Sequence, residues 1–207
     1  MILTPGVPGV AFGTISDGDG RVDESARSAI SSELGIPSAW ALIDQVHGDT
    51  VVTVDSPGHK GPADGLITSS DGVPLAVATA DCVPVAIVGS SSVGIFHAGW
   101  RGVASRIVEK GIDLMRSNGD DPVTAVVGPH IGSCCYEVGA EVVEAIGGFE
   151  ATTRWGSRSV DLAAALAPQV AGLGVAYIPG CTMERVEFAS HRENATKRRQ
   201  VAVVWKN

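Results

Sequence analysis

Four short runs of apolar and β-branched residues lie close together between residues 65 and 97 of this 207-residue chain. Turn-forming residues bound each run, which is the pattern of buried β-strands rather than of helices. We predict strands at Gly65 to Thr68, Leu75 to Thr79, Val83 to Val88 and Val93 to His97.

The rest of the chain mixes strand and helix patterns without strict alternation. Helical spacing of apolar residues, or a glycine stop signal, predicts helices at Val22 to Leu34, Gly102 to Met115, Gly139 to Ile146 and Leu162 to Leu173. Further strands are predicted at Ala41 to Val46, Thr50 to Val54, Thr124 to Val127, Val175 to Pro179 and Val201 to Trp205. This mixture favours an α+β fold over a doubly wound parallel sheet. No linker divides the chain, so we expect one catalytic domain over residues 1–207.

The composition excludes several classes of protein. Hydrophobic residues make up 44% and charged residues 18%, as in a folded globular chain. A formal charge of −8 argues against a nucleic-acid partner, and the basic cluster Lys197 to Arg199 is interpreted as a solvated turn. The apolar stretch Val73 to Val88 contains Asp81 and two prolines, so it does not predict a membrane span. No secretory n-region or disulfide pattern is present, which predicts a cytoplasmic protein.

Three predicted strand ends carry polar side chains that are costly to bury without a partner. These are His47 after one strand, Cys82 between two strands and His97 at the end of a third. Zinc prefers cysteine sulfur and histidine nitrogen, and three protein ligands leave a fourth position open, as in catalytic sites. From spacing alone, the alternatives stay open: a strand-end histidine is often a hydrogen-bonding group, and a buried cysteine is often a small apolar residue.

Five strings in the chain resemble the YfiH family, also called the laccase-domain or multicopper polyphenol oxidase family. The strings are Gln45 to Gly48 (QVHG), Thr79 to Cys82 (TADC), His97 to Gly102 (HAGWRG), Cys135 to Gly139 (CYEVG) and Phe188 to Arg192 (FASHR). The resemblance implies two mixed sheets packed between helices, similar to the catalytic domain of cytotoxic necrotizing factor toxins. It also implies phosphorolysis of adenosine, inosine and methylthioadenosine, and deamination of adenosine.

The same resemblance assigns roles to the triad, His191, Arg192 and Arg199, while the roles of Arg101 and Asp81 follow from their positions in the sequence. The metal ligands are His47, Cys82 and His97, holding one zinc ion per chain. Arg101 is expected to bind phosphate at a helix start, although a surface salt bridge is the alternative. His191 and Arg192 are expected to contact the nucleoside. Asp81 is expected to support the ligands or to move protons, and Arg199 matches a family arginine.

The chain also departs from the family at three places, one of which is Arg198, where the family commonly has the glycine of a Gly-Arg pair. The Asn-Leu pair of the amino-terminal loop is missing from residues 13–19, which leaves substrate contacts from that loop without a candidate. His130 stands where a small residue is common and is interpreted as a loop histidine, as is His59 from its own surroundings. Cys134 and Cys135 are interpreted as packing or pocket-lining residues, and Cys181 has no predicted role.

Two other functions are compatible with parts of this pattern. Cys82 as nucleophile and His97 as base would make a cysteine hydrolase or an enzyme that edits cell-wall precursors, because the related toxin domains use a Cys–His pair. Copper-dependent phenol oxidation needs many histidines in paired H-x-H strings. The chain has five histidines and no such string, which argues against it.

Overall fold

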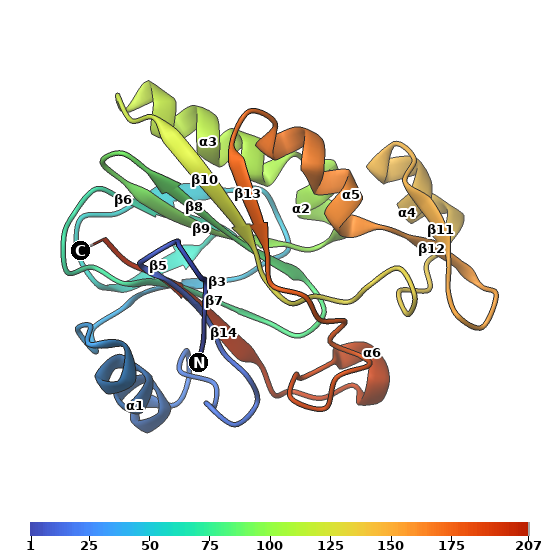
Figure 1. Cartoon of the computed structure of the whole chain (residues 1–207), viewed down its shortest axis with the longest axis horizontal. Helices are drawn as coiled ribbons and strands as arrows, with labels where there is room; N and C mark the ends of the chain where they lie inside the picture. Colours follow the sequence, from blue (N-terminus) through green and yellow to red (C-terminus); the bar gives the residue numbers. More distant parts are fainter. Residues whose placement is uncertain (207) are drawn as a thin grey trace.

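The computed structural model describes residues 1–206 and contains two six-stranded sheets stacked face to face (Figure 1). The first sheet has the order β1 (Ile2–Leu3), β2 (Val10–Phe12), β14 (Gln200–Val204), β7 (Leu75–Thr79), β3 (Ala41–Asp44) and β5 (Gly58–Pro62). The second has the order β13 (Gly174–Tyr177), β10 (Pro122–Val127), β8 (Val83–Gly89), β9 (Val93–Ala98), β6 (Gly65–Thr68) and β4 (Val51–Thr53). Both contain parallel and antiparallel pairs, for example β3 with β7 and β8 with β9.

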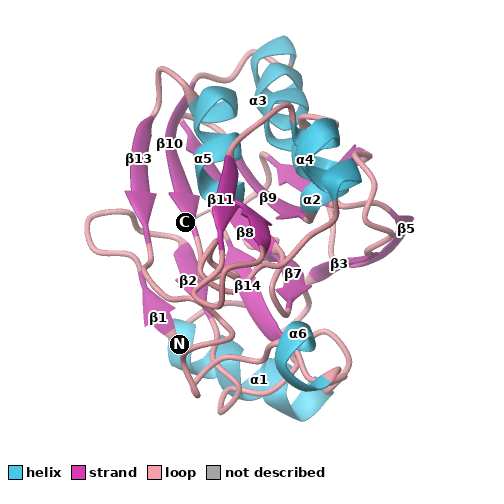
Figure 2. Ribbon diagram, turned by 90° about the vertical axis from the view of Figure 1, so that its right-hand side faces the viewer, coloured by secondary structure: helices cyan, strands magenta, loops and turns pink. Residues whose placement is uncertain are grey.

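Helices cover the outer faces of the two sheets. Helix α1 (Glu24–Leu34) lies under the first sheet, while α2 (Trp100–Ala104), α3 (Ile107–Ser117) and α5 (Leu162–Leu166) cover the second. One end of the molecule carries α4 (Ala140–Ile146), α6 (His191–Asn194) and the hairpin of β11 (Glu150–Thr152) and β12 (Arg158–Val160), as Figure 2 shows. This arrangement confirms the predicted α+β fold with two mixed sheets between helices.

No helix within residues 1–206 is both long and apolar enough to cross a membrane.

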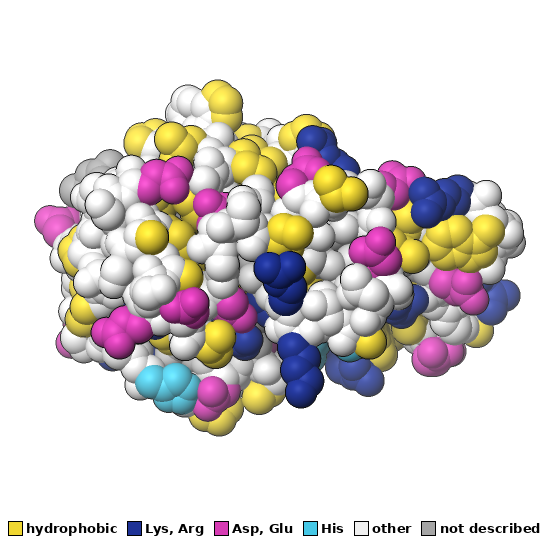
Figure 3. All heavy atoms as spheres, turned by 90° about the horizontal axis from the view of Figure 1, so that it is seen from below, with side chains coloured by type: hydrophobic (Ala, Val, Ile, Leu, Met, Phe, Trp, Pro, Cys, Tyr) yellow, Lys and Arg dark blue, Asp and Glu magenta, His cyan; other side chains and the backbone are white. Residues whose placement is uncertain are grey.

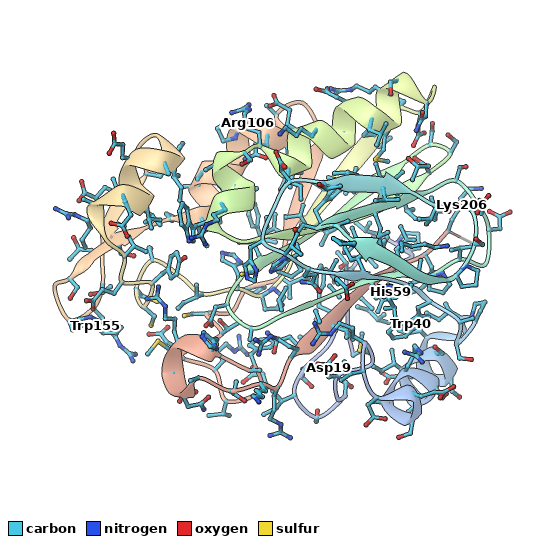
Figure 4. All side chains as sticks on the ribbon, turned by 180° about the vertical axis from the view of Figure 1, so that it is seen from behind. Asp19, Trp40, His59, Arg106, Trp155 and Lys206 are labelled. Atoms are coloured by element: carbon cyan, nitrogen blue, oxygen red, sulfur yellow. The ribbon has the colours of Figure 1, made fainter. Side chains whose placement is uncertain are left out.

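Three apolar layers hold the elements together. One lies between the second sheet and its helices, one between the two sheets, and one between the first sheet and α1. Trp40 belongs to the third layer and is only 2% exposed, and its indole Nε1 donates to Ser31 Oγ of α1 at 2.9 Å (Figure 4). Burial of these alternating faces is the dominant favourable contribution to folding.

Two predicted helices differ in the structure. The segment 102–115 is divided into α2 and α3, because Arg106 has a left-handed backbone with φ of 59°. The apolar stripe nevertheless continues through both helices, which is why the sequence pattern reads as one. The segment 162–173 is helical only to residue 170, with a 3-10 turn at Ala167–Val170 that contains Pro168, whose ring removes a backbone donor.

Several short strands were not predicted, including β1, β2, β5 and the β11–β12 hairpin. The strand β5 is an exposed edge strand of mostly polar and glycine residues, so it carries no alternating pattern. It forms because β3 offers it parallel pairing. His59, predicted to be a loop residue, is exposed on this strand, with its Nε2 3.0 Å from Asp44 Oδ1.

A buried carboxylate links the β8–β9 turn to the segment before β10. Asp120 is 8% exposed and accepts five hydrogen bonds from the backbone and hydroxyl groups of Ser90, Ser91 and Ser92. Burial alone would raise the pKa of Asp120, but the three serines hold it well below its usual range. The carboxylate therefore stabilises the fold while it is ionised.

We predict that Asp120→Asn lowers the free energy of unfolding at pH 7 by about 2–3 kcal/mol. Because the folded pKa is depressed, this contribution is complete above the unfolded pKa of about 4 and is lost as the pH falls toward the folded pKa. Urea unfolding at pH 7 and pH 3 should show the difference from wild type shrinking at the lower pH. Asp121→Asn, at the exposed neighbouring position, is the control; a loss as large as that of Asp120→Asn would contradict the assignment.

Candidate metal centre and active site

Three predicted ligands meet where the chain passes from one sheet to the other. His47 follows β3 of the first sheet and precedes β4 of the second, and Cys82 lies between β7 and β8, again one strand of each sheet. His97 lies near the end of β9. The ligand atoms of the three residues all lie within 4.8 Å of one another, and the two imidazole rings meet edge to face with centroids 4.8 Å apart. The structure therefore brings the predicted triad together.

A fourth residue, Asp64, orients this cluster and was not predicted. Its side chain is fully buried, and its Oδ1 lies 2.7 Å from Nδ1 of His97. The same carboxylate accepts backbone N–H bonds from His47 at 3.1 Å and Gly48 at 2.6 Å. Asp64 thus holds one histidine by its ring and the other by its backbone, which leaves Nε2 of His97 directed elsewhere. The only sequence signal was an aspartate directly before a buried strand.

The backbone at the cluster adopts conformations that are costly for ordinary residues. His47 has φ of 59° and Asp81 has φ of 88°, and such left-handed residues concentrate at functional sites. Gly99 leaves room for two of the ligand side chains, because a Cβ at this position would lie 3.2 Å from both Cys82 Sγ and a ring carbon of His47. The first glycine of the HAGWRG string is therefore explained by close packing against the cluster.

The cluster shifts the charge state of its own members. Burial would raise the pKa of the Cys82 thiol, but hydrogen bonds with His47 and His97 and their charges lower it to about 6. Burial would lower the pKa of His97, but its bonds with Asp64 and Cys82 raise it to about 9. A thiolate beside two imidazoles can bind a metal through one sulfur and two nitrogens. The same thiolate and a neighbouring imidazole can also act as a nucleophile and its base.

Asp81 connects the cluster to loops far away in the sequence. Its Oδ1 accepts from Thr182 Oγ1 at 2.7 Å and its Oδ2 from the backbone N–H of Arg192 at 2.8 Å. Its backbone carbonyl accepts from the N–H of Ile131 at 3.0 Å. Both carboxylate oxygens are thus engaged in holding neighbouring segments, which supports positioning rather than proton transfer by Asp81.

A cavity of about 640 Å³ opens onto the cluster. Its wall contains His47, Asp81, Cys82 and His97 together with aromatic, apolar and cationic side chains. The cations are Arg21, Arg101, Arg192, Lys197 and Arg199. The Arg101 guanidinium lies 4.3 Å from the Trp100 ring centroid, and that of Arg192 lies 4.8 Å from the centroid of Tyr136. A chain of net charge −8 therefore places five cations around one pocket.

Two loops, one near each end of the chain, contribute three of these cations. Lys197 and Arg199, expected to form a solvated turn, both line the cavity, where Lys197 is exposed and Arg199 is half-buried. The amino-terminal loop, which lacks the Asn-Leu pair, contributes Arg21, whose Nε is buried without a hydrogen-bond partner. Figure 3 shows Lys and Arg side chains close together near the middle of one face, among scattered acidic ones. Arg21 and Lys197 were missed because they lie in loops without periodicity, whereas Arg199 matches a family arginine.

The remaining predicted residues fall into two groups. His191 and Arg192 lie on α6 and line the cavity, as expected. His130 is half-buried with its Nδ1 2.8 Å from the Gly128 carbonyl, and burial lowers its pKa. It lies outside both groups of possible metal ligands found in residues 1–206. Cys134, Cys135 and Cys181 form the second of those groups, together with Glu184.

The fold and the His–Cys–His cluster define an α+β protein with a candidate metal-binding site between two sheets. Residues 11–207 match the family described as multi-copper polyphenol oxidoreductase laccase, and the chain belongs to this family.

Proteins similar to this chain include purine nucleoside phosphorylases. One from Mycobacterium tuberculosis is 36% identical over 97% of this chain and 88% of the relative, and one from Streptomyces coelicolor is 34% identical over 93% and 86%. The solved structure of the hypothetical protein YfiH from Bacillus licheniformis has a TM-score of 0.80 at 29% identity, covering 91% of this chain and 82% of that one. YlmD from Geobacillus stearothermophilus has a TM-score of 0.77 at 28% identity, with the same coverage. The chain is thus a member of a family that includes purine nucleoside enzymes.

We predict that Asp64→Asn lowers the free energy of unfolding by about 3 kcal/mol, because an amide cannot satisfy His97 together with the backbone N–H groups of Val46, His47 and Gly48. Asp44→Asn is the matched control, since Asp44 pairs with His59 in solvent and its loss should cost less than about 1 kcal/mol. Urea unfolding of both variants at pH 7 measures the difference. Equal effects of the two substitutions would contradict the organising role of Asp64.

Proposed function

We propose that this chain is a zinc-dependent purine nucleoside enzyme. It would cleave adenosine, inosine and methylthioadenosine with phosphate, and it would also deaminate adenosine. The observation that carries the proposal is the cationic cavity that surrounds the His–Cys–His cluster, because it joins an anion-binding wall to a metal-type centre. The names of the similar proteins support the phosphorolysis. Both sheets contribute residues to the site, so the proposal treats residues 1–207 as one catalytic domain.

The donor set fits a single zinc ion. His47, Cys82 and His97 offer two nitrogens and one sulfur, and Asp64 occupies Nδ1 of His97 in the way that carboxylates orient ligand histidines. When bound there, zinc would supply Lewis acidity and lower the pKa of water, the chemistry that hydrolytic deamination requires. Cys82 would act as a ligand thiolate, consistent with its lowered pKa.

The cations of the cavity account for the phosphate. In phosphorolysis a phosphate oxygen attacks C1′ of the ribose, the glycosidic bond breaks, and its electron pair leaves with the purine, which takes up a proton. Arg101 and Arg192 present guanidinium groups that are held over aromatic rings, and Lys197, Arg199 and Arg21 add charge from two loops. Guanidinium groups pair with phosphate oxygens in a bidentate manner, so these residues would hold the nucleophile against the sugar.

The nucleoside would contact the remaining wall. Tyr136 and Trp100 offer aromatic surface, and exposed His191 can donate a hydrogen bond to the departing purine. Asp81 would act as a positioning residue, because it fixes the backbone of Arg192. Copper oxidation of phenols finds no support from the arrangement. Of the five histidines, only His47 and His97 belong to a group of possible metal ligands within residues 1–206.

A second candidate function follows from the lowered pKa of Cys82. With a free thiolate and His97 as base, the same cluster would support a cysteine hydrolase, such as an enzyme acting on cell-wall precursors. The two functions differ in the state of one sulfur atom. In the zinc enzyme this sulfur is bound to metal, and in the hydrolase it is free to attack a substrate.

The proposed activity is tested by incubating purified protein with adenosine, with and without phosphate. Adenine and ribose 1-phosphate should form only with phosphate, and inosine should form in both cases. Arg101→Ala should reduce kcat/KM for phosphorolysis by about 10- to 100-fold, since one charge-assisted hydrogen bond is worth roughly 1.5–3 kcal/mol. Deamination should fall much less, because it requires no anion. Arg116→Ala, an exposed arginine of α3 outside the cavity, is the control; equal losses in both reactions would indicate a structural role for Arg101.

The state of Cys82 separates the two candidate functions. In the zinc enzyme, alkylating reagents should modify Cys82 slowly until a chelator has removed the metal, and chelation should abolish activity as Cys82→Ser does. Peptide mass spectrometry measures the rate of modification at Cys82 before and after chelation. Rapid alkylation of untreated protein, with activity insensitive to chelators, would instead establish the hydrolase.

A further inference from the structure

Three of the four cysteines lie together in a group separate from that of Cys82. Cys134 and Cys135 come from the loop after β10, and Cys181 comes from the loop after β13. Glu184 joins them, and the ligand atoms of all four residues lie within 4.8 Å of one another. The two sulfurs of Cys134 and Cys135 are 3.5 Å apart. None of these residues has a part in the proposed nucleoside chemistry.

Local backbone geometry brings the thiols to one point. The N–H groups of Cys135 and Tyr136 both bond to the Gly132 carbonyl at 3.0 Å, which makes a tight turn that carries the two adjacent cysteines. Glu184 and Arg185 both donate backbone N–H groups to the Cys181 carbonyl at 3.1 Å, so Glu184 returns beside Cys181. The two loops are also joined directly, because the N–H of Thr182 bonds to the His130 carbonyl at 3.0 Å.

Two further features are typical of thiolate ligands. The backbone N–H of Gly132 donates to Cys181 Sγ at 3.3 Å, the kind of surrounding hydrogen bond that supports a coordinating atom. Gly132 also packs closely against the cluster, since a Cβ there would lie 3.2 Å from Cys134 Sγ. Arg154 holds one oxygen of Glu184 at 2.9 Å and offsets negative charge beside the cluster.

We propose that Cys134, Cys135, Cys181 and Glu184 form a second metal site that binds a thiophilic cation such as zinc. Three sulfurs and one carboxylate oxygen supply the four ligands of a closed tetrahedral site, in contrast to the three ligands of the first cluster. Glu184 is exposed, so the metal can reach the site from solvent. The site is structural, and it does not depend on the proposed function.

The metal would fasten two loops that shape the active-site cavity. The loop of Cys134 and Cys135 continues into Tyr136, which lines the cavity. The loop of Cys181 continues into Thr182, whose hydroxyl bonds to Asp81 directly before Cys82. Fixing both loops to one ion therefore stabilises the wall of the cavity without any contact between that ion and the substrate.

The test counts metal in a protein whose first cluster has been removed. The variant His47→Ala/Cys82→Ser, purified under reducing conditions, should bind one equivalent of zinc, while the wild type binds two. Titration of this variant with cadmium should give a thiolate-to-metal absorption band in the ultraviolet that saturates at one equivalent. X-ray absorption of the bound zinc should show sulfur as the majority of its neighbours.

A complementary variant removes the second site alone. Cys134→Ser/Cys181→Ser should lose one equivalent of zinc and retain the other, and Glu184→Gln, at an exposed position, should weaken the binding of zinc while the protein stays folded. The proposal is overturned if His47→Ala/Cys82→Ser binds neither zinc nor cadmium, or if thiol titration under these conditions shows a disulfide within the cluster. Because these readouts count metal rather than turnover, they stand apart from failure of the nucleoside assay.

Discussion

The contact between the Asp64 carboxylate and the His97 imidazole is the interaction on which the site depends. A buried carboxylate is costly unless its oxygens are fully engaged. Here the carboxylate is hydrogen-bonded to Nδ1 of His97 and accepts the backbone N–H groups of His47 and Gly48. One group therefore fixes both histidines. Burial would raise the pKa of Asp64, but the bond with His97 keeps it below its ordinary value. The negative charge is therefore retained, and it helps to raise the pKa of His97.

The strongly apolar parts of the fold were predictable from the sequence. The strands β6, β7, β8 and β9 are buried on both faces, so they can be predicted from their nearly continuous apolar runs. Polar edge elements such as β5 form only because a neighbouring strand accepts them, which a linear pattern does not record. Gly35 marked the end of α1 correctly, because its left-handed backbone favours glycine. The break at Arg106 has no such marker.

The site shows the same division. His47, Cys82 and His97 stand at strand ends, where polar residues are conspicuous against apolar neighbours. Asp64 occupies an equivalent position but adjoins no motif, and its role appears only when β6 is placed beside β9. Lys197 and Arg199 looked like part of a solvated turn because charge runs usually are. Their place in the cavity is set by the pairing of β14 with β7, a contact between segments more than a hundred residues apart.

Two of the crossings between the sheets have a mechanical consequence. His47 and Cys82 each lie on a link that joins a strand of the first sheet to a strand of the second. The apolar layer between the sheets is non-directional and does not itself specify how one sheet is aligned with the other. Sliding of one sheet over the other would change the separation of these side chains. The geometry of the cluster therefore depends on how the two sheets are aligned, and its chemistry requires the alignment seen in this structure.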